Sequence, residues 1–447
     1  MTTNVMNDPE FKQLCLYLSS VLLLSRMQAR ISFKGWNIYV SNTEIQQSEL
    51  WEVSRQLIGF DTVSAHSNLE AVHYLEGYLK EMGFNVKVIV DQVDGVDKAS
   101  VLAWYGPAVS NGLMISGHID VVPFDGQPGW KTNPRVMQTD GKRIYGRGTA
   151  DMKIAMAQAL VAAKQVIKQQ QDFKRPLLFI FTYDEEVAGQ GSGKLIKILP
   201  QFFKETLPMP EVALIGEPTD FEIFPAHKGY ATFDLVVHGK GGHSSVPKKG
   251  LNAIEKMGDV IRIISEIDTE LEERITAENI ELFPECPPSA FNCGIINGGL
   301  AGNMIADTCR LKMSLRVSPG DSSEEIIGTL KERIEDRVAR KMREFAPDCD
   351  VVIENLHSTP PMKSPMQSSL SALLSRVMEK QVVHGAPYGT DAGNFQHLGI
   401  NSYICGPGAL SEAHQPNESI PVEHFLSGQE KLEQIIAAWC VKDEGTH

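Results

Sequence analysis

Segments with a helical pattern alternate with short apolar runs from Ser48 to about residue 220, and this alternation constrains the fold more than any other feature of the sequence. Strand-like apolar runs lie at 85–90, 99–106, 112–122, 177–183 and 212–218. Helical patterns lie at 48–58, 68–82, 151–171 and 191–205. Strands separated by helices are typical of a mostly parallel sheet with helices on both faces, so we expect an α/β fold.

A second pattern replaces the first near Pro225. The segment 230–239 alternates apolar and polar residues, as a half-exposed antiparallel strand does. The segments that follow are a helix at 251–273, strands at 290–297 and 308–317, a charged helix at 322–344 and a strand at 349–354. This order predicts a smaller α+β unit of the β-α-β-β-α-β type.

The first pattern resumes after Pro361, so one domain is expected to be interrupted by another. A chain of 447 residues is also too long for one ordinary hydrophobic core. We predict an N-terminal extension of unknown role at 1–47, a main α/β domain at 48–225 and 356–447, and an inserted α+β domain at 226–355.

Charge and cysteine usage limit the partners and the compartment. The net charge of −14 argues against nucleic acid or an anionic membrane as the main partner. The seven cysteines are scattered and form no CxxC pair. An odd number of scattered cysteines is typical of reduced thiols and indicates a cytoplasmic protein.

The apolar run at 14–24 resembles the core of a secretion signal. Asp8 and Glu10 nevertheless give it an acidic start, where such signals are basic. The run is also shorter than the ~20 residues that span a bilayer. We interpret it as an extra helix, or as the result of a start codon placed before a true start at Met27.

Histidine and carboxylate side chains gather where the expected strands end. Ligands of open α/β sheets bind beyond the carboxyl ends of the strands. The side chains in question are those of His118, Asp120, Asp151, Asp184, Glu185, Glu186, Glu217 and His414. Adjacent carboxylates repel one another and lose hydration near a core, so their arrangement requires a compensating charge.

Each of these residues also has an ordinary structural interpretation. A pair such as His118 and Asp120 is more often a satisfied polar pair than a metal site, and Asp151 is a favourable charge at the start of a helix. Glu217 stands before a proline and can be a turn residue, and His414 is one of twelve histidines. The conjunction at one sheet edge, rather than any single residue, therefore predicts a site.

Two divalent cations would neutralise this cluster. The predicted ligands are His118, Asp151, Glu186, Glu217 and His414. Mixed histidine and carboxylate ligation fits zinc, with cobalt or manganese as substitutes. Glu185 and Glu186 point to opposite sides if the chain is extended there, so one can bind metal while the other acts as a general base.

Six motifs occur together over residues 48–440: GHIDVVP, GRGTADMK, DEEVAGQGS, GEPT, GKGGHSSVP and AHQPNE. In this order and spacing they resemble the co-catalytic zinc amidohydrolases and peptidases, a family that includes aminoacylase, glutamate carboxypeptidase, succinyl-diaminopimelate desuccinylase and acetylornithine deacetylase. The resemblance implies two Zn²⁺ per subunit, with Co²⁺ as a substitute, bound by the same five ligands. It also implies that Asp151 bridges the metals, that Asp120 orients His118, and that Glu185 is the general acid and base.

The resemblance assigns further roles that the residues alone do not. The inserted domain would be a lid and a dimerisation module, and the protein a homodimer. His243 would donate to the oxyanion, often from the partner subunit, although by itself it looks like a surface loop residue. Arg316 and Asn303 resemble residues that hold a substrate carboxylate, and Thr390 lies in a substrate-side segment.

Several stretches look closest to the acetylornithine deacetylase subgroup, among them FDTVSAHSN, AHKGY, YGTDAGNFQ and CGPGALSEAHQPNE. Asp391 stands where a glutamate is expected in that subgroup. This difference leaves another N-acyl amino acid as an alternative substrate. The expected reaction is hydrolysis of N2-acetyl-L-ornithine to L-ornithine and acetate, in arginine biosynthesis. The alternatives are a related N-acyl-amino-acid hydrolase (a desuccinylase, aminoacylase or dipeptidase) and a non-catalytic binding protein on the same scaffold.

Overall fold

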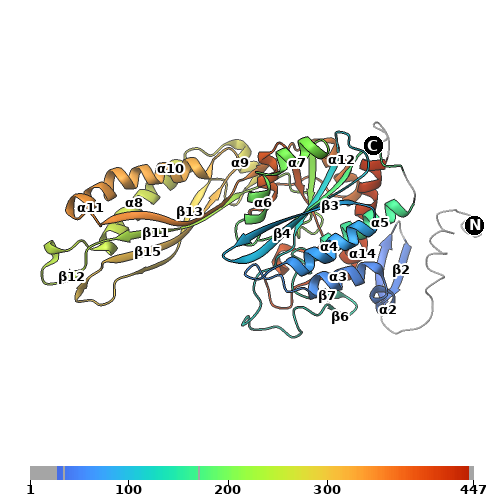
Figure 1. The fold of residues 1–447 in the computed structure, drawn as a ribbon, viewed down its shortest axis with the longest axis horizontal. Helices are drawn as coiled ribbons and strands as arrows, with labels where there is room; N and C mark the ends of the chain where they lie inside the picture. Colours follow the sequence, from blue (N-terminus) through green and yellow to red (C-terminus); the bar gives the residue numbers. More distant parts are fainter. Residues whose placement is uncertain (1–27, 34–35, 170–171, 442–447) are drawn as a thin grey trace, which may run out of the picture.

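The computed structural model describes residues 28–33, 36–169 and 172–441. Figure 1 shows an elongated molecule with two bodies: a larger one built on a twisted sheet, and an arm that carries a second sheet. The apolar run at 14–24, which we interpreted as an extra helix, lies outside the described residues.

The larger body contains a six-stranded sheet in the order β18-β9-β5-β8-β4-β3. Its strands are β3 (Asn85–Val93), β4 (Val96–Tyr105), β5 (Leu113–His118), β8 (Leu177–Thr182), β9 (Val212–Ile215) and β18 (Asn401–Ile404). The first four strands in the spatial order are parallel, whereas β4 and β3 run antiparallel at one edge. The predicted mostly parallel α/β fold is confirmed.

Alternate residues of the buried strands enter two different cores. Leu177, Phe179 and Phe181 of β8 lie in the larger cluster, and Leu178 and Ile180 lie in the smaller one. The larger cluster is covered by α3 (Glu49–Gly59), α4 (Leu69–Glu81), α5 (Lys153–Lys168), α12 (Ser369–Met378) and α14 (Val422–Ile436). The smaller cluster is covered by α6 (Gln190–Leu195), α7 (Leu199–Thr206) and α13 (Ala392–His397).

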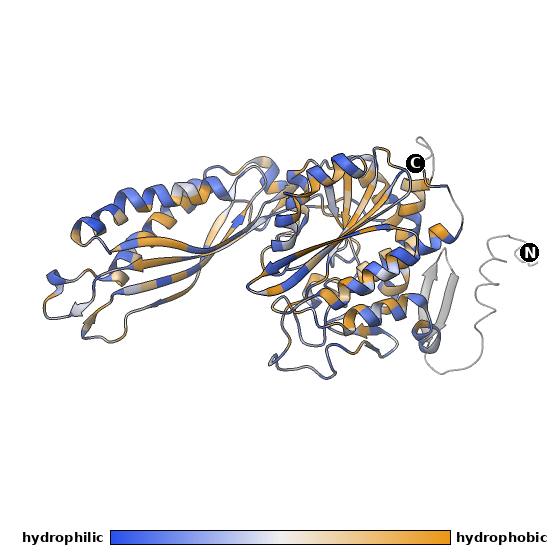
Figure 2. Ribbon diagram, viewed as in Figure 1, coloured by the Kyte–Doolittle hydropathy of each residue, from blue (hydrophilic) through white to orange (hydrophobic). Residues whose placement is uncertain are grey.

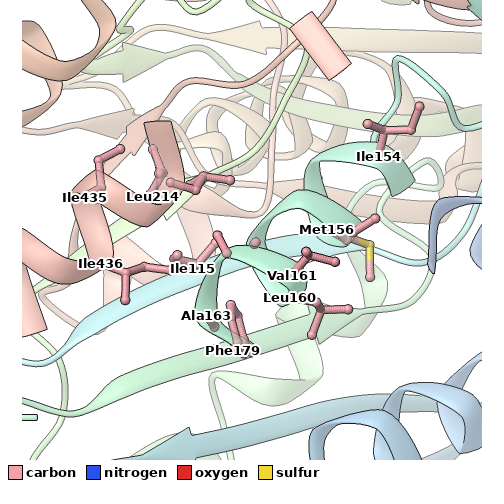
Figure 3. Close-up of a cluster of buried hydrophobic side chains, with 14 of the residues drawn as sticks. Ile115, Ile154, Met156, Leu160, Val161, Ala163, Phe179, Leu214, Ile435 and Ile436 are labelled. Atoms are coloured by element: carbon pink, nitrogen blue, oxygen red, sulfur yellow. The ribbon is translucent and has the colours of Figure 1, made fainter. Parts of the chain in front are cut away.

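Helix α5 is buried on nearly all sides because it lies between the sheet and other helices. Figure 3 shows its side chains Leu160 and Val161 among Ile115, Phe179 and Ile436. The Kyte–Doolittle colouring in Figure 2 shows the same apolar concentration along the central strands. This buried helix starts two residues after Asp151 and so gives that residue a rigid support.

The arm is a four-stranded antiparallel sheet in the order β13-β15-β11-β16. Its main elements are β11 (Gly229–His238), α8 (Ala253–Glu272), β13 (Ala290–Gly298), β15 (Thr308–Val317), α10 (Ser323–Ile334) and β16 (Asp350–Thr359). This is the predicted β-α-β-β-α-β unit, with its own hydrophobic core against α8 and α10.

Shorter elements connect or extend these two bodies. They are β1 (Gln28–Phe33), β2 (Trp36–Ser41), α2 (Asn42–Gln46), β6 (Gln138–Thr139), β7 (Arg143–Tyr145), β10 (Ala226–His227), β12 (Gly242–His243), η2 (Pro247–Lys249), α9 (Ala277–Leu282), β14 (Met304–Ile305), β17 (Met362–Lys363), η4 (Leu410–Glu412), β19 (Ser419–Pro421) and η5 (Ala437–Val441). Strands β1 and β2 pair with each other as an antiparallel hairpin.

Three expected elements differ from the structure. The helix expected at 191–205 is two helices, and Pro200 stands in the first turn of the second. The helix expected at 322–344 is interrupted by the π-helical turn η3 (Glu335–Ala339) before α11 (Arg340–Phe345). Strand β16 continues to Thr359, because it pairs with β11 as far as Tyr230, so we propose 226–359 rather than 226–355 for the insertion.

Within the described ranges, no helix combines the length and the apolar character that a membrane crossing requires.

Candidate metal centre

The five predicted ligands converge at the carboxyl edge of the large sheet. His118 is the last residue of β5, Glu186 follows β8, and Glu217 follows β9. Asp151 lies in the turn before α5, and His414 follows the short helix η4. Ligand atoms of His118, Asp151 and Glu217 lie within 4.8 Å of one another, and so do those of Asp151, Glu186 and His414.

Asp151 belongs to both groups and faces a different histidine with each of its oxygens. Its Oδ1 lies 2.9 Å from Nε2 of His118, and its Oδ2 lies 3.1 Å from Nε2 of His414. Nε2 of His414 is also 3.0 Å from Oε2 of Glu186. A carboxylate with one oxygen in each of two donor groups has the geometry of a bridging ligand between two cations.

In this cluster the buried carboxyl groups outnumber the basic side chains. Burial raises the pKa of the Glu217 carboxyl well above its usual range and raises the pKa of Glu186 to about 7. Burial also opposes ionisation of Asp151, but its hydrogen bonds with His118 and His414 hold its pKa below the usual value. The same bonds from Asp151 and Glu186 raise the pKa of His414 to about 10. A bound cation would remove this competition for protons.

The tautomer of His118 favours metal binding. Its Nδ1 lies 2.9 Å from the backbone carbonyl of Asp120, which can only accept, so Nδ1 carries the proton. Burial opposes a charge on this ring, but the hydrogen bond and the charge of Asp151 raise the pKa of His118 well above its usual range, so Nε2 also carries a proton and donates to Asp151. A bound cation would take the place of that proton between the two ligands. The donor set of two imidazoles and three carboxylates therefore fits a pair of divalent ions.

Asp120 supports the site in a different way from the one its motif suggests. Its carboxylate is 3.6 Å from Nδ1 of His118, so the backbone carbonyl is the closer partner of the ring. The carboxylate instead accepts bonds from the hydroxyl of Ser64 and from the backbone N–H groups of Glu185 and Glu186. Asp120 thus holds the turn that carries the adjacent glutamates.

The chain is not extended at the three consecutive acids. Asp184 has a φ of 52°, and a turn follows it, so the premise that neighbouring side chains point to opposite sides is wrong here. The carboxylate of Asp184 accepts a bond of 2.8 Å from Nζ of Lys98, and both side chains are 2 % exposed. Asp184 is therefore neutralised by a lysine of β4, and only Glu185 and Glu186 remain for the site.

The side chain of Glu185 is free to act on a ligand. It forms no hydrogen bond or ion pair with any residue in the described part of the chain. Burial raises its pKa well above the usual range, the charge of His118 lowers it, and the charge of Glu217 raises it again. A carboxylate with no protein partner beside the two candidate metal groups can accept and return a proton.

A buried ion pair holds the loop of Asp151, and it was not predicted from the sequence. Oε1 of Glu418 accepts bonds from the backbone N–H groups of Gly148, Ala150 and Asp151, at 3.0, 2.8 and 3.0 Å. Its Oε2 accepts a bond of 2.7 Å from Arg147. Arg147 lies in the motif GRGTADMK and Glu418 in the motif AHQPNE. Their pairing could not be predicted from the sequence, because the two residues are far apart in the chain.

Gln127 connects this ion pair to the loop of His414. Its amide oxygen accepts a bond of 2.7 Å from Arg147, and its amide nitrogen donates one of 2.8 Å to the backbone carbonyl of His414. The loops that carry two of the five candidate ligands are therefore braced by one side chain.

The remaining predicted residues are distributed over both bodies. His243 and Asn303 are exposed and adjoin one another at the short antiparallel pair β12–β14, at the end of the arm far from the larger body (Figure 1). Arg316 lies at the opposite end of β15, with its guanidinium 4.2 Å from the ring centre of Tyr230. Thr390 is fully buried, and its hydroxyl accepts a bond from the N–H of Ala392 at the start of α13.

Comparison with known proteins identifies the class. Residues 114–438 match the family described as Peptidase family M20/M25/M40. This match covers most of the chain, so the protein belongs to that family, and it is a metal-dependent hydrolase.

One curated relative is the acetylornithine deacetylase of Klebsiella pneumoniae (strain 342). It is 32% identical over 398 residues, which cover 87% of this chain and 97% of the relative. Two solved structures share the fold at lower identity. A metallo-carboxypeptidase from Sulfolobus solfataricus has a TM-score of 0.69 at 17% identity and covers 88% of this chain and 99% of its own. A dinuclear metal-binding peptidase of Bacillus subtilis has a TM-score of 0.55 at 16% identity, with 87% and 97% covered.

Proposed function

We propose that the protein hydrolyses the amide bond of N2-acetyl-L-ornithine to L-ornithine and acetate, as a step of arginine biosynthesis in the cytoplasm. The observation that carries the hydrolytic part is Asp151, which presents one oxygen to each of two candidate metal groups. The similarity to an acetylornithine deacetylase supports the substrate. All six cysteines in the described ranges are free, which agrees with a reducing compartment.

The cofactor that we propose is a pair of Zn²⁺ ions per subunit, with Co²⁺ as a substitute. His118 and Glu217 would hold one ion, Glu186 and His414 the other, and Asp151 both. Two bound divalent ions supply a water with a pKa lowered towards ~7 and polarise the carbonyl that it attacks.

Glu185 is the proton carrier in this proposal. Its side chain has no partner in the described ranges, although its backbone N–H is fixed by Asp120. It takes the proton of the attacking water and later gives it to the leaving α-amine. Proton transfer in both directions requires a carboxylate whose position is fixed and whose oxygens are free. The bond to Asp120 fixes the backbone of Glu185 and leaves its side-chain oxygens free.

Residues of the arm would enter the site from a second subunit. His243 and Arg316 lie near opposite ends of β15, a strand of ten residues that spans about 30 Å. They cannot both contact one small substrate within a single chain. We therefore propose that Arg316 binds the substrate carboxylate in its own subunit, while His243 and Asn303 reach that site from the partner and His243 donates to the oxyanion.

The arm also offers a surface for the proposed homodimer. Strand β13 is one of the two edge strands of the arm sheet, and most of its residues are exposed. Ile295 and Ile296 on this edge are 56% and 51% exposed, and the nearby Leu300 is 84% exposed. A long edge with apolar side chains is normally covered in the functional state.

A substrate panel tests the proposed reaction. Purified protein with added Zn²⁺ or Co²⁺ is assayed with acetyl-ornithine, succinyl-diaminopimelate, other acetyl amino acids and dipeptides. The proposal predicts the largest kcat/KM for acetyl-ornithine. A larger kcat/KM for a succinyl substrate or a dipeptide would still show a hydrolase but would contradict acetyl-ornithine as its substrate.

Mixed subunits test the contribution of the partner. The variants Glu185→Gln and His243→Ala are each expected to be inactive alone. If His243 acts across the dimer, a mixed dimer contains one complete site, so mixing and reassociation should restore roughly a quarter of the wild-type activity. Absence of any restored activity in verified mixed dimers would place His243 in the site of its own subunit, and activity of His243→Ala alone would place it outside the site.

A further inference from the structure

The side-chain amide of Gln127 joins two loops at the metal centre. Its Oε1 accepts bonds from Nη2 of Arg147 at 2.7 Å and from Nε1 of Trp130 at 2.9 Å. Its Nε2 donates a bond of 2.8 Å to the backbone carbonyl of His414. Two donors on one side and an acceptor on the other allow only one orientation of the amide. The network therefore directs the amide nitrogen at the residue of a candidate metal ligand.

His414 depends on loop contacts more than the other candidate ligands do. His118 ends β5, which is paired with a strand on each side. The backbone N–H groups of Asp151 and Glu186 each bond to a buried carboxylate. The side chain of His414 is instead 50% exposed, and its φ of 62° lies in the left-handed region. A non-glycine residue is uncommon there and needs surrounding contacts to hold it.

The same two loops are also joined at a second place. The amide nitrogen of Asn417 donates a bond of 2.8 Å to the backbone carbonyl of Gly129, and its oxygen accepts one of 2.7 Å from the N–H of Lys131. A Cβ atom on Gly129 would stand 3.3 Å from the ring of Pro416, so the two chains are in close contact. Segments 127–131 and 414–417 therefore form one unit.

We propose that Gln127 is a positioning residue for His414 and thereby sets the affinity of one metal ion, the ion held by Glu186 and His414. This inference rests on the proposed function, because it takes the pair of ions from it. The bond to the carbonyl of His414 fixes the peptide that follows the imidazole. Nε2 of this imidazole lies 3.1 Å from Asp151 and 3.0 Å from Glu186. Without the bond the ring is free to leave this position, and ordering it again opposes metal binding.

The other ion should be independent of Gln127. Its terminal ligands, His118 and Glu217, lie at the ends of adjacent strands of the large sheet. Within the described residues, Gln127 forms no hydrogen bond with either of them. The structure therefore predicts that a change at Gln127 acts on one ion of the pair and spares the other.

The test is Gln127→Met, which keeps the approximate length of the side chain and removes its donor and acceptor groups. Wild type and variant are stripped with a chelator, titrated with Co²⁺ and followed by visible absorption, and the bound ions are counted. The variant should keep one ion at wild-type affinity and bind the second about 10- to 100-fold more weakly. The measurement needs no substrate.

Two reference variants identify the ion that is affected. His414→Ala and His118→Ala each remove one terminal ligand, from opposite groups. The absorption spectrum of Gln127→Met with one equivalent of Co²⁺ should match that of His414→Ala, because both retain the ion of His118 and Glu217. It should differ from the spectrum of His118→Ala, in which the remaining ion has other ligands.

The matched control is Gln158→Met in the same body. Gln158 is buried, and its amide nitrogen donates to the backbone carbonyls of His424 and Phe425 at 2.8 and 2.9 Å. This variant should melt at a lower temperature and still bind both ions with wild-type affinity. It shows whether loss of a structural glutamine alone changes metal binding.

Three results would overturn the inference. They are two ions bound by Gln127→Met with wild-type affinity, equal weakening of both ions, and a remaining ion with the spectrum of His118→Ala. A wild type that binds fewer than two ions would contradict the metal pair of the proposed function itself, and this inference with it. The count on the wild type therefore separates the two kinds of failure.

Discussion

Replacement of Glu418 by glutamine should destabilise the buried ion pair that supports the Asp151 loop. The wild-type carboxylate accepts three backbone N–H bonds with one oxygen and the Arg147 bond with the other. In Glu418→Gln the amide oxygen can still accept the backbone bonds, but the amide nitrogen then faces the guanidinium. A donor meets a donor, and a buried arginine loses its counter-charge.

The magnitude follows from burial. The side chains of Arg147 and Glu418 are 2% and 0% exposed, so the pair has almost no access to water. Removal of one partner of such a pair costs about 3–5 kcal/mol of unfolding free energy. Asp151 belongs to the loop that this ion pair supports. Loss of a group that orients a metal ligand lowers metal affinity by about 10- to 100-fold, and we expect a decrease of this size in Glu418→Gln.

Urea denaturation and competition with a chromophoric chelator measure the two effects. The matched control is Glu412→Gln, which breaks the 3.1 Å pair between Arg143 and Glu412, with side chains 33% and 36% exposed. An exposed pair of this kind contributes less than about 1 kcal/mol. Equal stability and equal metal affinity of Glu418→Gln and Glu412→Gln would refute the structural role of the buried pair.

Three further predictions concern other described residues. Glu185→Gln should keep its bound metal and lose about 10³-fold or more in turnover; near-normal turnover would remove Glu185 from its role. Lys98→Met leaves the buried Asp184 unpaired and should cost about 3–5 kcal/mol in urea denaturation, much of which the added change Asp184→Asn should restore. Burial lowers the pKa of His227 to about 4, so the unfolded chain binds its proton first as the pH falls from about 6.5. Stability present above that pH is lost progressively towards pH 4, by about 2 kcal/mol between pH 7.5 and 5. This loss should be smaller in His227→Leu, and equal losses in the two proteins would exclude the titration of His227 as the cause.

The candidate ligands could be predicted because strand ends share one edge of a parallel sheet. His118 is the last residue of β5, and Glu186 and Glu217 follow its two neighbours in the sheet, so their convergence is a consequence of topology. The direction of β4 was not predicted, although Asp94 and Gly95 have the positive φ values of a two-residue hairpin turn. An Asp-Gly pair between two strand patterns was the available signal.

The supporting residues could not be predicted, since their partners are distant in sequence. Lys98 looks like one polar residue in a strand, and only the fold places it against Asp184, 86 residues away. Pairings of this kind depend on three-dimensional contacts that no periodicity or local motif encodes.

The separation of His243 from Arg316 could not be predicted from the motifs that contain them. His243 and Arg316 both match residues expected near a substrate, but the length of β15 separates them within one chain. The structure shows only this separation, and the contribution of a second subunit is our proposal to account for it.

The most direct test of the central claim is a metal count on active protein, combined with chelation. We predict about two divalent ions per chain, loss of amide hydrolysis on removal of those ions, and recovery when Zn²⁺ or Co²⁺ is added back. Protein that hydrolyses an amide at full rate while free of metal and indifferent to chelators would contradict the assignment of the acid cluster as a metal centre.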